Sequence, residues 1–220
     1  MCALLDEIRE QPTVLERMLA RQGAIREIAR HIATAGVRHV LLAARGTSDN
    51  AGQYGKYLLG AANGLPVALA APSLYTLYGA PPRLDGALVL GISQSGASPD
   101  ICAVIEDARR QGAPTVVLTN APDSPLARAA EYVIDLGAGP EKSVAATKTY
   151  TAELMALALL SAHLAEDGER LEQLRALPEA VARTLEMNDG VAGRAERYRY
   201  MGGCAVVARA AGTVAMGLHT

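Results

Sequence analysis

The sequence predicts an α/β fold with a doubly wound sheet of five parallel strands and helices on both faces. Five short apolar runs have strand length: residues 40–44, 67–70, 87–92, 115–119 and 132–136. They are nearly continuous rather than alternating, which is typical of strands covered on both faces. Helical patterns lie between them, most clearly at 50–59 and 99–111. This alternation favours a parallel sheet with right-handed crossovers.

Helices are predicted before the first strand. Residues 4–33 read as helical in two or three pieces because apolar residues such as Leu15, Met18 and Leu19 recur at helical spacing. Pro12 and Gly23 are interpreted as the joints between the pieces. Residues 1–36 are therefore expected to form an N-terminal helical extension, and residues 37–166 the sheet domain.

After the last predicted strand, a long helix is expected over 143–165. Residues 154–160 are apolar nearly all the way round, which predicts a place in the core or at a subunit interface. A further amphipathic helix is expected over 168–187, followed by a polar stretch at 194–199, within a helical connector of residues 167–200. Residues 204–208 read as the first strand of a second α/β unit, so 201–220 is interpreted as the truncated start of a second, similar domain.

Composition narrows the class of protein. The 220 residues are 50% hydrophobic and 20% charged, which predicts a soluble globular chain. A net charge of -2 without basic blocks, and 4% aromatic residues, argue against nucleic-acid binding. Three cysteines without Cys-x-x-Cys spacing favour a reducing cytoplasm and predict no metal site. The most apolar helical stretch, 154–162, is about half of a membrane span, so no membrane partner is expected.

Two hydroxyl-rich loops follow predicted strands. Gly46-Thr47-Ser48 comes after the first strand, and Ser93-Gln94-Ser95-Gly96, with Ser98, comes after the third. Ligands in open parallel sheets lie beyond the carboxyl ends of the strands, and helix N-termini there favour phosphate. Either loop alone is ordinary turn and N-cap chemistry, but together they predict an anion site. The anion can be a sugar phosphate, a nucleotide or inorganic phosphate.

A third segment, 139–149, enters the long helix near the same edge. Glu141 is its best candidate for acid/base work and Lys148 its best additional cation, although a charged helix entrance is usually solvated. Nucleotide binding is disfavoured because no Gly-x-Gly-x-x-Gly follows a strand, and residues 52–57 lack the spacing of a Walker loop.

These three motifs, together with residues 7–12, resemble the sugar isomerase (SIS) domain family, in particular the isomerase half of glucosamine-fructose-6-phosphate aminotransferase and relatives without a glutaminase domain. The resemblance covers most of residues 7–165. It implies a flavodoxin-like sheet of five parallel strands and a homodimer of two-domain subunits whose catalytic residues lie beyond Thr220. It also implies a phosphosugar held, with Val144 near the sugar, by the two loops: Thr47, Ser48, Ser93, Gln94, Ser95 and Ser98.

The resemblance leads to an expected function with one alternative. The leading hypothesis is aldose/ketose isomerisation, or amination or deamination at the second carbon, of a hexose 6-phosphate of the fructose 6-phosphate or glucosamine 6-phosphate type. Such chemistry runs through an enediol or imine and requires no nicotinamide, metal or pyridoxal cofactor. The alternative is a non-catalytic phosphosugar-binding or regulatory module. Gly46 and Glu141 complete the predicted phosphosugar site, and no catalytic residue is assigned.

Overall fold

The computed structural model describes residues 3–203 and confirms the predicted five-stranded parallel sheet. The strands follow the predicted runs, with ends that differ by at most one residue, and His39 joins the first of them. Because strand ends depend on single backbone hydrogen bonds, such small differences are expected. The strands are β1 (His39–Ala44), β2 (Val67–Leu69), β3 (Ala87–Ile92), β4 (Thr115–Thr119) and β5 (Tyr132–Asp135).

The strand order determines where the loops meet. The order is β2-β1-β3-β4-β5, and every neighbouring pair is parallel. The order reverses between β1 and β3, which lie side by side with Ala44 opposite Ile92. Ligands of doubly wound sheets bind at such a switch point. The loops that leave β1 and β3 therefore start next to each other at the carboxyl edge of the sheet.

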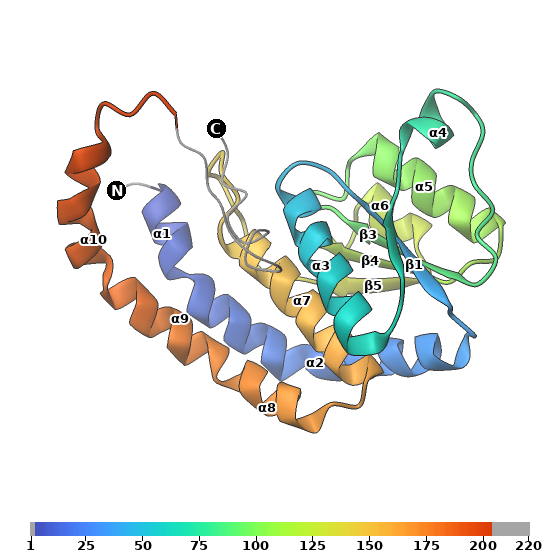
Figure 1. Ribbon diagram of the computed structural model, residues 1–220, viewed down its shortest axis with the longest axis horizontal. Coiled ribbons are helices and arrows are strands. Elements are labelled where there is room, and N and C mark those ends of the chain that lie inside the picture. The colour runs from blue at the N-terminus through green and yellow to red at the C-terminus, as the bar shows by residue number, and fades with distance from the viewer. Residues whose placement is uncertain (1–2, 204–220) are drawn as a thin grey trace.

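Helices cover both faces of the sheet (Figure 1). One core lies between the sheet and α2, α3 and α7, and the other lies mainly between the sheet and α5 and α6. Neighbouring strand residues alternate between the cores: Leu88 and Leu90 belong to the first, and Val89 to the second. The α-helices are α1 (Ala3–Arg9), α2 (Gln11–Thr34), α3 (Thr47–Asn63), α4 (Ser73–Thr76), α5 (Pro99–Arg110), α6 (Pro125–Ala129), α7 (Lys148–Leu164), α8 (Gly168–Arg175), α9 (Leu177–Glu186) and α10 (Asn188–Ala195), followed by a 3-10 turn at Glu196–Tyr198.

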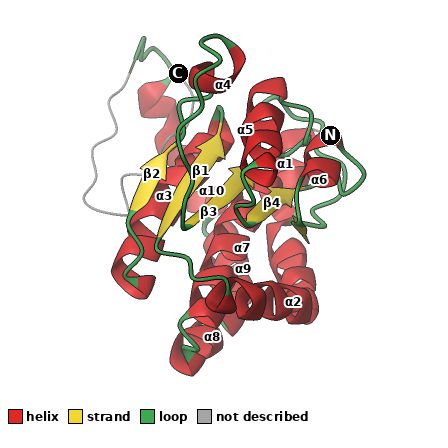
Figure 2. Cartoon of the chain, turned by 90° about the vertical axis from the view of Figure 1, so that its right-hand side faces the viewer, coloured by secondary structure: helices red, strands yellow, loops and turns green. Residues whose placement is uncertain are grey.

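The N-terminal helices pack against the sheet domain. Val14, Met18 and Ile25 of α2 belong to the same core as the first face of the sheet. α2 also contacts α7 and α9, and Figure 2 shows these three helices gathered on the side away from α5. The apolar stretch of α7 is buried from Met155 to Ala162, which confirms a place in the core.

Two glycines let α3 approach its neighbours closely. A Cβ atom on Gly52 would lie 2.6 Å from Leu42 Cδ2 of β1. A Cβ atom on Gly55 would lie 3.3 Å from side-chain carbons of Leu42 and Leu157. Small residues here let α3 pack closely on β1 and, at Gly55, on α7.

The structure corrects several helix predictions. Gly23 is not a joint, because α2 runs through it and the packed side chains outweigh a cost of about 1 kcal/mol for an internal glycine. α7 begins at Lys148 rather than near 143, because side-chain acceptors hold the preceding residues in a loop. The helix expected over 168–187 is divided at Ala176, where Pro178 opens α9.

The last sequence predictions concern the C-terminal part of the chain and the absence of a membrane span. The stretch at 194–199, which was expected only to be polar, contains the end of α10 and the 3-10 turn. The predicted strand at 204–208 lies outside the described residues. No helix in residues 3–203 is long and apolar enough to cross a membrane.

Candidate functional site

The loop after β1 depends on a glycine. Gly46 has φ +60° and ψ -132°, a conformation that is essentially restricted to glycine, and α3 begins directly after it. This turn places Thr47 and Ser48 in the first turn of α3, where backbone N–H groups have no partner within the helix. The Ser48 side chain is buried, and its hydroxyl donates to Glu153 Oε1 at 2.8 Å.

The loop after β3 is held by its own backbone and by the end of β4. Ser93 N donates to Leu118 O at 3.1 Å, and Gly96 N returns to Ser93 O at 3.2 Å. The Gln94 carbonyl accepts from Asn120 N at 3.0 Å. Gly96 has φ +59°, and a Cβ atom there would lie 2.0 Å from Ser124 Oγ. The loop therefore has little freedom to change shape.

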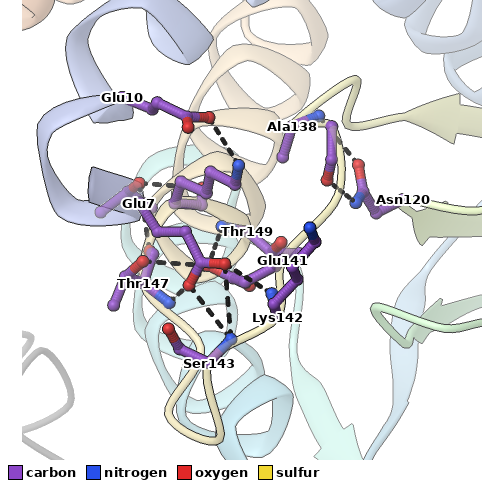
Figure 3. A network of polar contacts seen from close by, with 12 residues as sticks. Glu7, Glu10, Asn120, Ala138, Glu141, Lys142, Ser143, Thr147 and Thr149 are labelled. Carbon is purple, nitrogen blue, oxygen red and sulfur yellow. Dashed lines mark hydrogen bonds and ion pairs between the residues drawn. The ribbon is translucent and has the colours of Figure 1, made fainter. Parts of the chain in front are cut away.

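A third part of the site is the β5–α7 segment, residues 136–147 (Figure 3). Asn120 holds its beginning, because its side chain donates to Gly139 O and accepts from Ala138 N, both at 2.8 Å. Glu7 of α1 holds its middle by accepting from the backbone N–H groups of Lys142 and Ser143. The hydrogen bond from Lys142 N is the main reason why the pKa of Glu7 is lowered.

Glu141 connects the β5–α7 segment to the two structures beside it. Its carboxylate accepts from Thr147 N at 2.8 Å and from Thr149 N at 3.4 Å, so it caps the start of α7. Its other oxygen accepts from Gln94 Nε2 at 3.3 Å. Glu141 therefore fixes the position of the Gln94 side chain, which also belongs to the site.

Lys148 differs from the usual exposed residue at a helix entrance. Its side chain is 2% exposed, and its ammonium forms an ion pair with Glu10, at the junction of α1 and α2. The interpretation of this helix entrance as solvated is therefore wrong for Lys148. A buried ammonium needs such a partner, and the junction between α1 and α2 supplies it.

The three segments and α7 enclose a cavity of about 270 Å³ at the switch point. Seven predicted site residues line it: Thr47, Ser48, Ser93, Gln94, Ser95, Ser98 and Val144. Val144 is fully exposed beside the cavity. The other two adjoin these residues, Gly46 as the residue before α3 and Glu141 through its bond to Gln94. The structure thus brings the whole predicted set together.

Sequence reasoning missed three residues that also line the cavity: Arg45, Ala146 and Glu153. Glu153 is 2% exposed, and its pKa is raised to about 8, first by burial and then by the negative charge of Glu141, against the opposing effect of the Ser48 hydrogen bond. The sequence signal for Glu153 is its position as an acidic residue directly before the apolar stretch 154–162. Buried acids without a cation partner are rare, and one beside a cavity is a candidate functional residue.

The cavity carries donors and few charges. Hydroxyls come from both strand–helix loops, and Gln94 adds an amide. Arg45 lies at the rim, where its guanidinium is 3.0 Å from Asp100 and largely exposed. Neutral donors and a helix N-terminus can hold a phosphate group, with one arginine nearby. Within residues 3–203, no group of three or more His, Cys, Asp or Glu side chains is placed to hold a metal ion.

Comparisons with known proteins identify the family of this chain. The model of the SIS domain family matches residues 34–162. A glutamine–fructose-6-phosphate aminotransferase (isomerizing) from Thermus thermophilus is 39% identical over 209 residues, which cover 89% of this chain and 34% of that protein. The chain thus spans about a third of the length of such relatives.

Two solved structures share the fold. A candidate phosphosugar isomerase from Silicibacter pomeroyi has a TM-score of 0.81 and 41% identity, covering 83% of this chain and 56% of that one. The C-terminal domain of glucosamine-fructose-6-phosphate aminotransferase from Francisella tularensis has a TM-score of 0.81 and 26% identity, covering 90% and 59%. Because the family model matches more than half of the residues, the chain belongs to the SIS domain family.

Proposed function

We propose that this chain binds a hexose 6-phosphate in the cavity at the β1/β3 switch point, with the phosphate held by the two hydroxyl-rich loops. The observation that carries the proposal is the convergence of Thr47, Ser48, Ser93, Ser95 and Ser98 on one cavity at a helix N-terminus. Hydroxyls and helix amides suit a phosphate dianion. The aminotransferase and isomerase names of the relatives support a phosphosugar as the ligand.

Each remaining predicted residue has a proposed part. Gly46 allows the turn that presents Thr47 and Ser48, and Glu141 orients the Gln94 amide toward the ligand. Val144, exposed beside the cavity, contacts the sugar rather than the phosphate. The phosphate is distant from the reacting carbons of such a sugar, so this site supplies binding and orientation.

The reaction that we propose for the complete protein is aldose/ketose isomerisation, or amination or deamination at the second carbon of the sugar. It is supported by the names of the relatives, of which this chain spans about a third. We further propose that residues 201–220 begin a second domain of the same kind, whose residues complete catalysis in a homodimer. The cytoplasm, where phosphosugars are metabolised, is the proposed location.

One observation favours the alternative of a non-catalytic binding module. Both acidic side chains at the cavity are engaged within the protein, Glu141 with Thr147, Thr149 and Gln94, and Glu153 with Ser48. An assay of the complete protein separates the two functions: fructose 6-phosphate alone tests isomerisation to glucose 6-phosphate, and fructose 6-phosphate with ammonia or glutamine as the amino donor tests formation of glucosamine 6-phosphate. Turnover would reject the non-catalytic alternative.

Thermal unfolding with added ligand tests the proposed binding. Fructose 6-phosphate and glucosamine 6-phosphate are expected to raise the melting temperature, whereas the unphosphorylated sugars are not, because ligands stabilise only the state that binds them. The double variant Thr47→Ala/Ser95→Ala should lose the shift. A matched double variant of exposed threonines on other helices, Thr34→Ala/Thr184→Ala, should keep it. An undiminished shift in the first variant would exclude these loops from the site.

A further inference from the structure

One carboxyl oxygen at the cavity has no partner. Glu153 lies one turn into α7, and its Oε1 accepts from the Ser48 hydroxyl. Its Oε2 is buried and makes no hydrogen bond among the described residues. A buried polar atom without a partner costs free energy, so its retention needs an explanation. Here the unpartnered oxygen belongs to a residue that lines the proposed binding cavity.

The Glu153–Ser48 pair can hold its hydrogens in two ways. When Glu153 is ionised, it only accepts, so the Ser48 hydroxyl must donate to it and presents lone pairs to the cavity. When Glu153 is protonated, it can donate to Ser48 Oγ, and the hydroxyl hydrogen of Ser48 is free to turn toward a ligand. Only the second arrangement gives a phosphate oxygen a hydroxyl donor at Ser48.

Burial, and then the negative charge of Glu141, favours the neutral form of Glu153. Glu141 lies close enough to raise the pKa of Glu153, and Tyr150, on the same helix, has its own pKa raised by burial and by Glu153. Two cations of the same part of the fold each have another partner. Arg45, from the loop after β1, is paired with Asp100 of α5, and Lys148 is paired with Glu10 beside α2.

We propose that Glu153 is a positioning residue that is protonated in the phosphosugar complex, and that the protonated acid turns the Ser48 hydroxyl toward the phosphate. An ionised Glu153 would also repel the phosphate dianion, and this repulsion likewise favours binding to the protonated form. The inference rests on the proposed function, since it requires the phosphate to lie at Ser48. It predicts that ligand affinity falls as the pH rises through the range in which free Glu153 ionises.

The test is the pH dependence of the dissociation constant for fructose 6-phosphate, measured by calorimetry with the 220-residue chain. With the pKa of Glu153 at about 8, the protonated fraction falls from about nine-tenths at pH 7 to about one-tenth at pH 9, so binding should weaken about tenfold. The phosphate ester, with its second pKa of about 6, stays a dianion throughout. Glu153→Gln keeps a neutral donor for Ser48, so its affinity should not change over this range.

A measurement on the unaltered chain supports the test in case the variant does not fold. At pH 8, binding heats in buffers of different ionisation enthalpy should show uptake of about half a proton per ligand. Zero uptake with equal affinity at pH 7 and pH 9 would overturn the inference and leave the proposed function standing. The same pH dependence in Glu153→Gln would also overturn it, because another group would then be titrating. Failure to bind at pH 7 would overturn both proposals.

Discussion

The site is built from two regions that keep their shape by different means. The loops after β1 and β3 are shaped locally, by Gly46 and Gly96 at positive φ and, in the loop after β3, by backbone bonds to the end of β4. The β5–α7 segment has few backbone bonds of its own and is held by the side chains of Glu7, Asn120 and Glu141. Substitutions should therefore act differently in the two regions. A change in a loop should disturb its backbone, whereas a change in one holding residue should release the segment.

Gly96→Ala should have the largest effect, because it disturbs the backbone-shaped region. The added Cβ would overlap Ser124 Oγ, and the alanine would have to adopt a positive φ. We therefore expect a loss of about 2–4 kcal/mol in the free energy of unfolding. Urea denaturation measures this loss. Gly112→Ala is the matched control, because Gly112 also has a positive φ, of +75°, but nothing lies within 4 Å of the new Cβ. Equal losses in both variants would show that contact with Ser124 is unimportant.

Asn120→Ala should have a smaller effect, because it removes one support of the β5–α7 segment. It leaves Gly139 O and Ala138 N without their partner, and we expect a loss of about 1–3 kcal/mol in the free energy of unfolding. Asn120→Asp retains the acceptor for Ala138 N but not the donor for Gly139 O. Its free energy of unfolding should therefore lie between those of wild type and Asn120→Ala. An unchanged denaturation midpoint in the alanine variant would contradict support of the segment by this side chain.

Glu7→Gln should have the smallest effect on the free energy of unfolding but a clear effect on local hydrogen exchange. The neutral amide accepts less strongly, so amide hydrogen exchange at Lys142 and Ser143 should become faster than in wild type. The pKa of Glu7 is lowered by these bonds, so its contribution is complete above its ordinary value of 4.5 and is lost as the pH falls through the lower folded value. The difference between variant and wild type should therefore shrink in acid.

The exposed residue Glu16 of α2 provides the control for this exchange experiment. Glu16→Gln removes the same charge from another N-terminal helix and should leave exchange at Lys142 and Ser143 as in wild type. Equal acceleration by both substitutions would indicate a general effect of charge. Exchange that Glu7→Gln leaves unchanged would contradict the proposed support of the segment from α1.

The same comparison explains how much could be predicted from the sequence. The sheet and both loops were predictable because apolar runs, glycines and hydroxyls stand next to one another in the chain. The late start of α7 was not, because it depends on where the Glu141 carboxylate lies in the folded chain. The same holds for Glu7, which reaches Lys142, and for Glu153, which reaches Ser48. The last two pairings join residues more than a hundred positions apart and leave no local pattern in the sequence.

The ion pair between Lys148 and Glu10 joins the segment matched by the family model to the helices that precede it. The match begins at residue 34, after α1 and α2, yet Lys148 and the β5–α7 segment find their carboxylate partners ahead of it. A chain that begins at residue 34 would leave the buried ammonium of Lys148 without its partner. It would also expose the apolar face that α2 covers. For this chain, the first residue of the family model and the first residue of the packed core are therefore different places.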